Sequence, residues 1–304
     1  MSRASGRHAL VTGGAGFVGS HLVDRLLAEG WRVLVIDDLS NGRPGNVAGG
    51  VRVEAFDIAI ADMDAAFRAW HARVVFHLAA QTSVPVSMQA PLRDLAVNVT
   101  GTHRVAAAAR DAGAERLVFV SSAGAIYGET TRPATEATLP APSSYYGVHK
   151  LAAEGQVTLC GLPYAIARPT NIYGPRQASG LEGAVVAAFV KQGLARQALT
   201  IDGDGRQTRD FVHVRDVVDA LVRLGDTTGP VGTWNVASGR RTSIEDLAGV
   251  VERGVGVELG RVRRPTRLGD VRHSSASALR LRTLGWRPTV SLAGGIRELL
   301  HPLR

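Results

Sequence analysis

A tyrosine and a lysine four positions apart, Tyr146 and Lys150, are the side chains whose types and spacing best suit acid–base chemistry. On a helix, residues four apart lie on the same face. An unperturbed tyrosine has a pKa of about 10, too high for a base at neutral pH, but a neighbouring ammonium group lowers that pKa. The spacing therefore predicts a tyrosine base assisted by a lysine, although so short a motif also occurs by chance on solvated helices.

Lysine is rare in this chain, which makes Lys150 more informative. Of the 35 basic residues, 33 are arginine, and the second lysine is Lys191. The skew itself, in a chain rich in alanine and glycine, indicates a genome bias. A guanidinium group is bulkier than an ammonium group and does not easily direct one compact charge at both a phenol and a ribose. A lysine at this spacing is therefore more suggestive here than in an average sequence.

Two serines, Ser121 and Ser122, follow the apolar run Leu117–Val120, which we expect to be a strand. Open α/β sheets bind their ligands at the carboxyl ends of the strands. A serine at that edge can form a hydrogen bond with a reacting hydroxyl or carbonyl group. Both serines are candidates, and a plain loop serine is an equal alternative for either.

A glycine-rich turn joins the predicted strand His8–Thr12 to the helical pattern that follows it. Gly14, Gly16 and Gly19 fit the pattern G-x-G-x-x-G. Gly13, Gly16 and Gly19 fit the related pattern G-x-x-G-x-x-G. Glycine adopts the positive φ that a tight turn needs, and its missing Cβ lets the backbone approach a pyrophosphate at the helix N-terminus. The turn therefore predicts a dinucleotide-binding site.

An acidic residue follows the next strand at the position expected of such a site. Asp37 comes directly after the predicted strand Arg32–Ile36, 18 residues past Gly19. Its carboxylate can accept hydrogen bonds from ribose hydroxyls and would repel a 2′-phosphate, so we expect NAD and not NADP. Asp38 adds to this preference, and Asp57 is a candidate contact for the adenine.

Short strands alternate with helical stretches, such as Val97–Ala112, through the first half of the chain. This alternation predicts an α/β fold with a Rossmann-type, doubly wound parallel sheet covered on both faces. We expect an NAD-binding domain over residues 1–170, with segments near 206–238 returning to it, and a smaller C-terminal α/β substrate lobe over residues 171–304. In that lobe, Thr242 and Glu245 fit a capping box that begins a helix.

Composition excludes several classes of protein. The 304 residues are 45% hydrophobic and 20% charged, which excludes a mostly disordered chain. No apolar run approaches the ~18–20 residues of a membrane span, and the first residues lack the apolar stretch of a signal peptide. The single Cys160 leaves neither an internal disulfide nor a multi-cysteine metal site, and the histidines show no metal-ligand spacing. We expect a cytoplasmic protein that binds no metal and no membrane.

The net charge of +8 is concentrated near the C-terminus. Positions 240–304 hold 13 basic and 6 acidic residues, a net charge of +7. This excess suggests either an anionic partner or a solvated, arginine-rich surface. The segment has a single aromatic residue, Trp286, and nucleic-acid-binding surfaces typically interleave several, so we expect no nucleic-acid partner.

The order of these motifs resembles the extended short-chain dehydrogenase/reductase family, and within it the NAD-dependent nucleotide-sugar epimerases and dehydratases. The resemblance spans nearly the whole chain and is closest to UDP-glucose 4-epimerase-like members. The segments that carry it are Thr12–Leu22, Asp37–Gly42, Phe76–Gln81, Asn98–Thr102, Ser121–Gly128, Tyr146–Lys150, Arg168–Arg176, Gly203–Val214 and Arg267–His273. So many motifs in one order are specific for the family and less specific for the reaction.

The resemblance implies a role for each motif. Tyr146 is the base, Lys150 supports it and holds the nicotinamide ribose, and Ser122 completes the catalytic triad. Ser121 stays possible, because the segment up to Tyr127 is one residue longer than the commonest family spacing. The implied NAD contacts are Gly13, Gly16, Phe17, Val18, Asp37, Asp38, Asn41, Gly42, Asp57, Ile58, Leu78, Ala79, Ala80, Asn98, Tyr146 and Lys150, with Asn98 either structural or on the cofactor side. The implied substrate contacts are Ser122 and Tyr146, together with Asn171, Arg209 and Arg267 at positions that hold the diphosphate.

The residues after the two serines distinguish between reactions of this family. The 4,6-dehydratases carry an Asp-Glu pair there, whereas this chain has Ala123 and Gly124. The remaining residues support 4-epimerisation of a UDP-glucose/galactose-type sugar. In that reaction Tyr146 removes the C4 hydroxyl proton as the C4 hydride passes to NAD, and the 4-keto sugar turns and is reduced on its other face.

Several alternatives stay open. The substrate is a glucose, N-acetylglucosamine or glucuronate form of a nucleotide-diphosphate sugar, with UDP favoured. Other enzymes of the family, such as a 4-ketoreductase, decarboxylase or dehydratase acting on a UDP- or dTDP-sugar, are the main alternative. An NAD-binding sensor is a second alternative, against which the intact Ser122, Tyr146 and Lys150 argue. The family also implies a homodimer formed through the helices that carry Asn98 and Tyr146.

Overall fold

The computed structural model describes residues 6–178, 184–266 and 271–301, and within these residues the chain divides into two compact units. The first unit contains the described residues up to Ser122, together with Ser144–Arg168 and Val218–Trp234. The second unit contains Ala123–Ser143, Pro169–Val217 and the described residues from Asn235 onward. The chain therefore passes between the two units several times.

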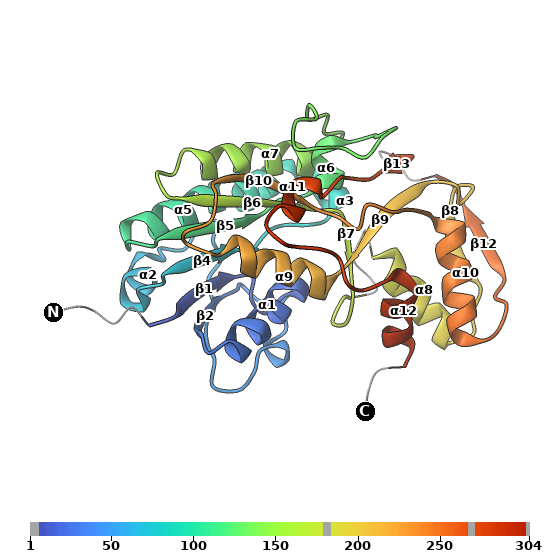
Figure 1. The fold of residues 1–304 in the computed structure, drawn as a ribbon, viewed down its shortest axis with the longest axis horizontal. Helices are drawn as coiled ribbons and strands as arrows, with labels where there is room; N and C mark the ends of the chain where they lie inside the picture. The colour runs from blue at the N-terminus through green and yellow to red at the C-terminus, as the bar shows by residue number, and fades with distance from the viewer. Residues whose placement is uncertain (1–5, 179–183, 267–270, 302–304) are drawn as a thin grey trace. The chain divides into compact units, whose positions relative to one another are not determined.

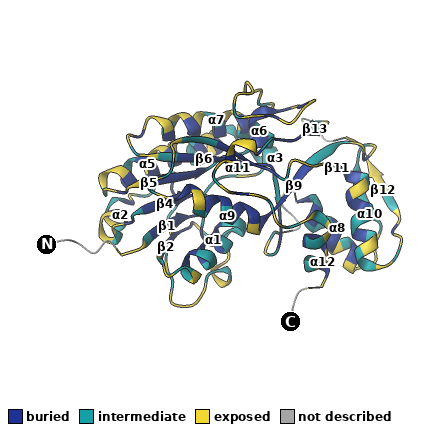
Figure 2. Cartoon of the chain, viewed as in Figure 1, coloured by how far each residue is buried: buried dark blue, intermediate teal, exposed yellow. Residues whose placement is uncertain are grey.

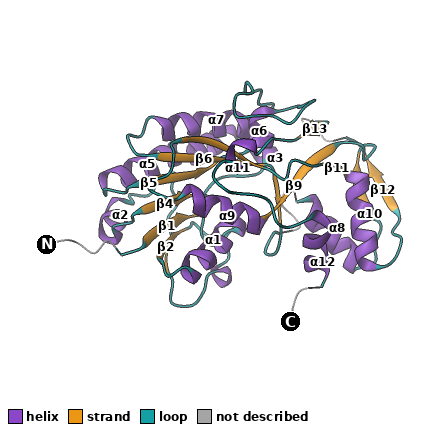
Figure 3. Ribbon diagram, in the orientation of Figure 1, coloured by secondary structure: helices purple, strands orange, loops and turns teal. Residues whose placement is uncertain are grey.

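In the described part of the chain, seven strands form one sheet in the order β10-β6-β5-β4-β1-β2-β3. Figure 3 shows its central strands β6, β5, β4, β1 and β2 in this order. The bounds are β1 His8–Thr12, β2 Arg32–Ile36, β3 Arg52–Glu54, β4 Val74–His77, β5 Arg116–Val120, β6 Tyr164–Pro169 and β10 Gly232–Val236. Neighbouring strands from β3 to β6 run parallel. The order changes direction between β1 and β4, where sheets of this type bind their ligands. The predicted Rossmann-type sheet is confirmed.

Helices cover both faces of this sheet (Figure 1). The helices are α1 Phe17–Ala28, α2 Asp64–Trp70, α3 Val84–Gln89, α4 Pro91–Leu95, α5 Thr102–Asp111, α7 Tyr145–Thr158 and α9 Val214–Leu224, with a 3₁₀ turn at Pro44–Asn46. An ion pair of 3.5 Å between Arg25 and Asp219 joins α1 to α9 on one face. On the other face, Leu34 and Leu117 of the sheet share a core with Val105 of α5 and Val157 of α7.

The central strands of the sheet are almost wholly buried (Figure 2), whereas the edge strand β3 has no buried residue. Every residue of β4 is buried, and four of five are buried in β1 and in β2. Covering on both faces removes the polar alternation of a half-exposed sheet, which is why these strands appear in the sequence as continuous apolar runs. The sheet is thus a rigid support for the residues that follow its carboxyl ends.

The predicted helix over Val97–Ala112 is present, but it begins differently from an ordinary α-helix. Ala96–Gly101 forms a π-helical turn between α4 and α5. Such turns occur frequently at functional sites because they displace a side chain from the regular helical position. Here the turn contains Asn98, which is buried.

The second unit has a smaller α/β arrangement of its own. Among its described residues, β7 Asn171–Tyr173, β9 Thr208–His213, β11 Arg241–Ser243 and β13 His273–Ser274 form one sheet, and β8 Leu199–Asp202 pairs with β12 Arg261–Arg264. Its helices are α6 Ala123–Tyr127, α8 Val185–Leu194, α10 Ile244–Val255, α11 Leu279–Arg282 and α12 Leu292–Leu300. Phe189, Phe211, Leu247 and Ile296 belong to its core. Among the described residues of both units, no helix is long and apolar enough to cross a membrane.

Candidate active site

The glycine turn after β1 has the geometry that the sequence predicts. Gly13 has φ +70°, and a Cβ there would lie 2.7 Å from the backbone nitrogen of Ala79. A Cβ on Gly19 would lie 2.0 Å from the carbonyl oxygen of Gly13. Real side chains do not fit at such distances, so the turn requires glycine at both positions. The turn therefore lies directly against the segment that follows β4.

The first turn of α1 is open toward a ligand. Gly16 is its N-cap, and no side chain among the described residues caps the helix. Gly16, Phe17 and Val18 are half-buried, whereas Gly19 is buried. Because the first N–H groups of a helix carry partial positive charge and lack helical partners, this is a suitable seat for a pyrophosphate. The cradle left by the missing Cβ atoms therefore fits a dinucleotide.

Asp37 is fixed beside this turn. The N–H groups of Ala15 and Leu39 each donate a hydrogen bond of 2.9 Å to its carboxylate. A Cβ on Gly42 would lie 2.5 Å from Asp37 Oδ1, so glycine is needed there too. Burial raises the pKa of Asp37, and the backbone N–H groups oppose that shift. The remaining lone pairs of the two oxygens are available for ribose hydroxyls.

The other residues of the predicted cofactor set have varied surroundings. Asp38 accepts hydrogen bonds from the N–H and hydroxyl groups of Ser40, and Asp57 accepts one from the N–H of Ala59. Asn41 is exposed, and Leu78, Ala79 and Ala80 are half-buried. Ile58 is 4% exposed and belongs to the core, so its backbone is the part left for contact with a ligand.

A buried threonine and histidine hold the segment after β4 in place. Thr12 Oγ1 accepts hydrogen bonds of 3.2 Å from the N–H groups of Leu78 and Ala79. The same oxygen lies 2.7 Å from His77 Nδ1, and His77 Nε2 lies 3.0 Å from Thr102 Oγ1. Burial lowers the pKa of His77 to about 3, so the ring is neutral. The sequence did not single out this pair.

Tyr146 and Lys150 lie in the first turns of α7, as predicted. Ser144 caps this helix by accepting a hydrogen bond of 3.2 Å from Gly147, and the Tyr146 N–H donates one of 3.1 Å to Ser87 Oγ. Lys150 is 2% exposed. Its ammonium group donates a hydrogen bond of 2.7 Å to the carbonyl of Val120 and lies 4.2 Å from the centre of the Phe119 ring.

The two serines after β5 differ in what they contact. The hydroxyl group of Ser122 is hydrogen-bonded to the Tyr146 phenol. The hydroxyl oxygen of Ser121 is buried and has no hydrogen-bond partner among the described residues. Ser122 is therefore the serine that the structure brings to the tyrosine.

Burial shifts the pKa values of both Tyr146 and Lys150. It raises the pKa of Tyr146 to about 12, opposed by the hydrogen bond with Ser122 and reinforced by the negative charge of Asp94. Burial lowers the pKa of Lys150 to about 7, and the negative charges of Glu154 and, to a smaller extent, Asp94 oppose this shift. In the protein alone, therefore, the tyrosine is protonated at neutral pH and the lysine changes charge near neutrality.

The structure also reveals buried polar contacts around this pair that spacing did not indicate. Asp94 is fully buried and contacts His149 and Asn98. The side-chain oxygen of Asn98 accepts a hydrogen bond from the Gln81 N–H, and its amide group donates one to the Gln81 carbonyl. A sequence signal did exist for one contact, since Asp94 and Asn98 are four residues apart.

Two of the three predicted diphosphate ligands, Asn171 and Arg209, lie in described strands of the second unit. Asn171 and Arg209 belong to the paired strands β7 and β9, with Asn171 in register with Phe211. The Asn171 amide donates to the carbonyl of Asp210, and the Arg209 guanidinium donates to the carbonyl of Thr208. Arg267 lies outside the described residues.

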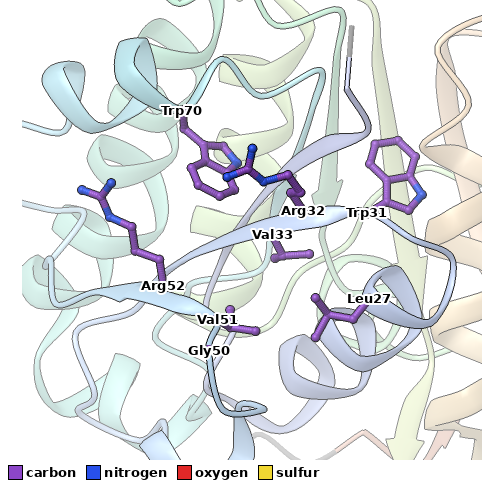
Figure 4. Close-up of a pocket in the computed structure, with 8 residues that line it drawn as sticks. All are labelled: Leu27, Trp31, Arg32, Val33, Gly50, Val51, Arg52 and Trp70. Carbon is purple, nitrogen blue, oxygen red and sulfur yellow. The ribbon is translucent and has the colours of Figure 1, made fainter. Parts of the chain in front are cut away.

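A pocket of about 420 Å³ lies elsewhere in the first unit (Figure 4). Its lining residues are Leu27, Trp31, Arg32, Val33, Gly50, Val51, Arg52 and Trp70. Arg32 and Arg52 begin β2 and β3, so the pocket is at the amino ends of these strands, whereas the predicted site residues follow carboxyl ends. Among the described residues, no cluster of His, Cys, Asp or Glu could hold a metal ion.

Residues 9–237 match the NAD dependent epimerase/dehydratase family. The chain belongs to this family, which confirms the predicted resemblance and the predicted cofactor, NAD.

Individual relatives are similar over their whole length. The chain is 42% identical to the UDP-glucose 4-epimerase of Mycolicibacterium smegmatis, covering 97% of this chain and 98% of that protein. It matches the structure of Thermotoga maritima UDP-glucose 4-epimerase with UDP-glucose at a TM-score of 0.92 and 36% identity, covering 96% and 97% of the two chains. It matches the structure of Thermus thermophilus UDP-glucose 4-epimerase in complex with NAD at a TM-score of 0.91 and 37% identity, covering 96% of this chain and 97% of that chain.

Proposed function

We propose that this protein is an NAD-dependent 4-epimerase of a UDP-sugar of the glucose/galactose type. The observation that carries the proposal is the hydrogen bond between Ser122 and Tyr146, close to Lys150 and followed in the chain by Ala123 and Gly124. This arrangement provides one proton-transfer group and no additional acid–base pair. Oxidation and reduction at a single carbon need no more than that, and the UDP-glucose 4-epimerases among the relatives support it.

The residues of the site suit reversible proton transfer at the C4 hydroxyl group. NAD, when bound, supplies reversible acceptance of a hydride. Tyr146 as phenolate accepts the C4 hydroxyl proton and returns it when the carbonyl is reduced. Ser122 donates its hydrogen bond to the developing negative charge, and Lys150 places a positive charge beside the tyrosine. Each residue ends the cycle in its starting protonation state.

The remaining assignments are part of the same proposal. Gly13, Gly16 and Asp37 are proposed to hold NAD with the rest of the predicted set. Residues 1–170, with segments near 206–238 returning to them, are proposed to form the NAD-binding domain. Asn171, Arg209 and Arg267 are proposed to bind the diphosphate from the lobe over residues 171–304, because guanidinium groups form strong charge-assisted hydrogen bonds with phosphate oxygens. A cytoplasmic location is also proposed.

We further propose a homodimer formed through α4 and α7 of the first unit. Leu92 is 78% exposed, and Leu95, Tyr145 and Val148 are also exposed although they are apolar. Exposed apolar side chains that gather on neighbouring helices are typical of surfaces buried by a partner. This proposal keeps α7, the helix of Tyr146, from the predicted interface, and it uses α4, which directly precedes the π-helical turn that contains Asn98.

The function is tested with the purified protein, NAD and separate UDP-glucose, UDP-N-acetylglucosamine and UDP-glucuronate samples, with products identified by NMR. We expect one of these to form a mixture with its 4-epimer without net production of NADH. Tyr146→Phe should lower the turnover rate by about 10²–10⁴-fold, because it removes the general base.

Other products would contradict the proposal. A UDP-pentose formed with release of carbon dioxide would identify a decarboxylase. A stable 4-keto sugar would identify a dehydrogenase if NADH forms with it, or a dehydratase if water is lost. If neither the wild type nor Tyr146→Phe converted any of these sugars, the protein would bind NAD without turnover, as an NAD-binding sensor does.

A further inference from the structure

The buried carboxylate of Asp94 connects the parts of the first unit that surround the catalytic pair. Asp94 is in the last turn of α4 and is 0% exposed. One carboxylate oxygen lies 2.6 Å from Nδ1 of His149, which immediately precedes Lys150 on α7. The other oxygen accepts hydrogen bonds from Gln81 at 2.6 Å and Asn98 at 3.1 Å. Three elements therefore meet at one carboxylate.

Each of these contacts leads to a segment with a place in the candidate site. Gln81 follows the segment after β4 that faces the glycine turn. Asn98 Oδ1 accepts a hydrogen bond of 3.1 Å from the Gln81 N–H, and Asn98 Nδ2 donates one of 2.9 Å to the Gln81 carbonyl. His149 is itself 8% exposed and stacks on Tyr145. Moving Asp94 would therefore disturb both the segment after β4 and the catalytic helix.

We propose that Asp94 is a positioning residue whose buried negative charge, fixed by His149, Gln81 and Asn98, sets the pH range in which Tyr146 and Lys150 operate. The carboxylate has three hydrogen-bond partners and is shielded from solvent. A charge buried in this way acts over a longer range than a solvated one, because little water screens it.

The directions of the charge effects support this assignment. The negative charge of Asp94 raises the pKa of Tyr146 and also raises that of Lys150. Because both shifts have the same sign, Asp94 moves the two titrations together along the pH scale. The free energy of moving a proton from the tyrosine to the lysine changes far less, so the maximal rate depends less on Asp94 than the pH optimum does.

Other ionisable groups around Lys150 act differently. Glu154 of α7 also raises the pKa of Lys150, but its carboxylate is paired with Arg168 of β6 at 2.5 Å. His77 of β4 is neutral, and its pKa is in turn lowered by Lys150. Of Glu154 and Asp94, the latter acts on both members of the catalytic pair.

Asp94→Asn separates charge from geometry. The asparagine oxygen can accept from Gln81 and Asn98, and its amide can donate to Nδ1 of a neutral His149. All three contacts can therefore persist without the charge. Asp94→Ser is a second neutral variant, which keeps the test intact if one of the two does not fold. Asp111→Asn is the matched control, because Asp111 is exposed on α5 and paired with Arg110.

Because the chain has two lysines, the protonation of Lys150 can be measured directly. In the full-length protein labelled with ¹³C at the lysine Cε, two signals are expected, from Lys150 and from the exposed Lys191, which serves as internal reference. We expect the titration midpoint of Lys150 to move to lower pH in Asp94→Asn and Asp94→Ser, because each removes a negative charge that raises the Lys150 pKa. It should stay at its wild-type value in Asp111→Asn. An unchanged Lys150 midpoint in the neutral variants would overturn the proposal.

A kinetic arm rests on the proposed function. If the protein is a 4-epimerase, both limbs of the pH profile of kcat should move to lower pH in Asp94→Asn, with a smaller change in the maximal rate. A lower kcat with an unshifted profile would mean that Asp94 serves the structure alone and would also refute the inference. The NMR titration involves no substrate, so failure of the proposed function and failure of this inference can be told apart.

Discussion

Replacing Lys150 with methionine should make the protein more stable and at the same time inactive. Lys150 is 2% exposed, and burial lowers its pKa from 10.5 to about 7. A methionine of similar length fills the same space without a charge to desolvate. The energetic effect follows from the difference between the folded and unfolded pKa values.

The direction with pH can be worked out from linkage. Between pH 7 and pH 10.5 the unfolded chain binds the lysine proton while the folded chain has released it, so the free energy of unfolding of the wild type rises with pH. Each pKa unit is equivalent to about 1.4 kcal/mol. Lys150→Met lacks this titration, so the stability that it gains over the wild type should be larger at pH 6 than at pH 9 by roughly 3 kcal/mol.

Urea denaturation of the wild type and Lys150→Met at several pH values, without added dinucleotide, measures this difference. The matched control is Lys191→Met, at an exposed lysine, whose stability relative to the wild type should not vary over the same range. Activity of Lys150→Met should fall by at least about 10²-fold. The reasoning would be refuted by a Lys150→Met protein that is less stable than the wild type at pH 6, or by a stability difference that does not change with pH.

Two further substitutions test the turn and the proposed dimer. Gly19→Ala would place a Cβ 2.0 Å from a backbone oxygen and should lower the free energy of unfolding by about 3 kcal/mol or more. The control Gly45→Ala, whose Cβ would meet no atom of other described residues within 4 Å, should change the free energy of unfolding by less than about 0.5 kcal/mol. Equal melting temperatures for the two variants would contradict this prediction. Leu92→Asp on α4 should convert the dimer to a monomer, as measured by light scattering. Leu139→Asp, at a similarly exposed leucine of the second unit, should leave the dimer intact. A monomeric wild-type protein would refute the dimer proposal.

Features set by neighbouring residues could be predicted from the sequence. The strands His8–Thr12 and Arg32–Ile36 have the predicted bounds, because apolar runs ending in Gly or Asp define them locally. Tyr146 and Lys150 occupy one face of α7, because four residues of helix guarantee it. A local prediction also failed: the cap of α10 is Ser243, which accepts from the N–H of Asp246, and not Thr242. Both residues fit the spacing of a capping box, and serine is the better cap.

Contacts between distant segments could not be predicted in this way. Arg116 is one of 33 arginines, a residue type that is mostly exposed in folded proteins, yet it is fully buried. Its guanidinium donates hydrogen bonds to the carbonyls of Leu224, Gly229 and Pro230. These partners are more than 100 residues away in sequence, and backbone carbonyls carry no sequence signal. Asp94 and His149, 55 residues apart, were overlooked for the same reason.

The structure gives a physical reason for a lysine at position 150 in a chain that otherwise uses arginine. The ammonium group occupies a space bounded by the Val120 carbonyl at 2.7 Å and the Phe119 ring at 4.2 Å, which suits a compact charge. A guanidinium group is wider and keeps its proton at every physiological pH. Burial brings the pKa of Lys150 to about 7, where a small change in the surrounding charge decides its protonation. The position therefore requires a group that is both small and able to titrate, and lysine meets both requirements.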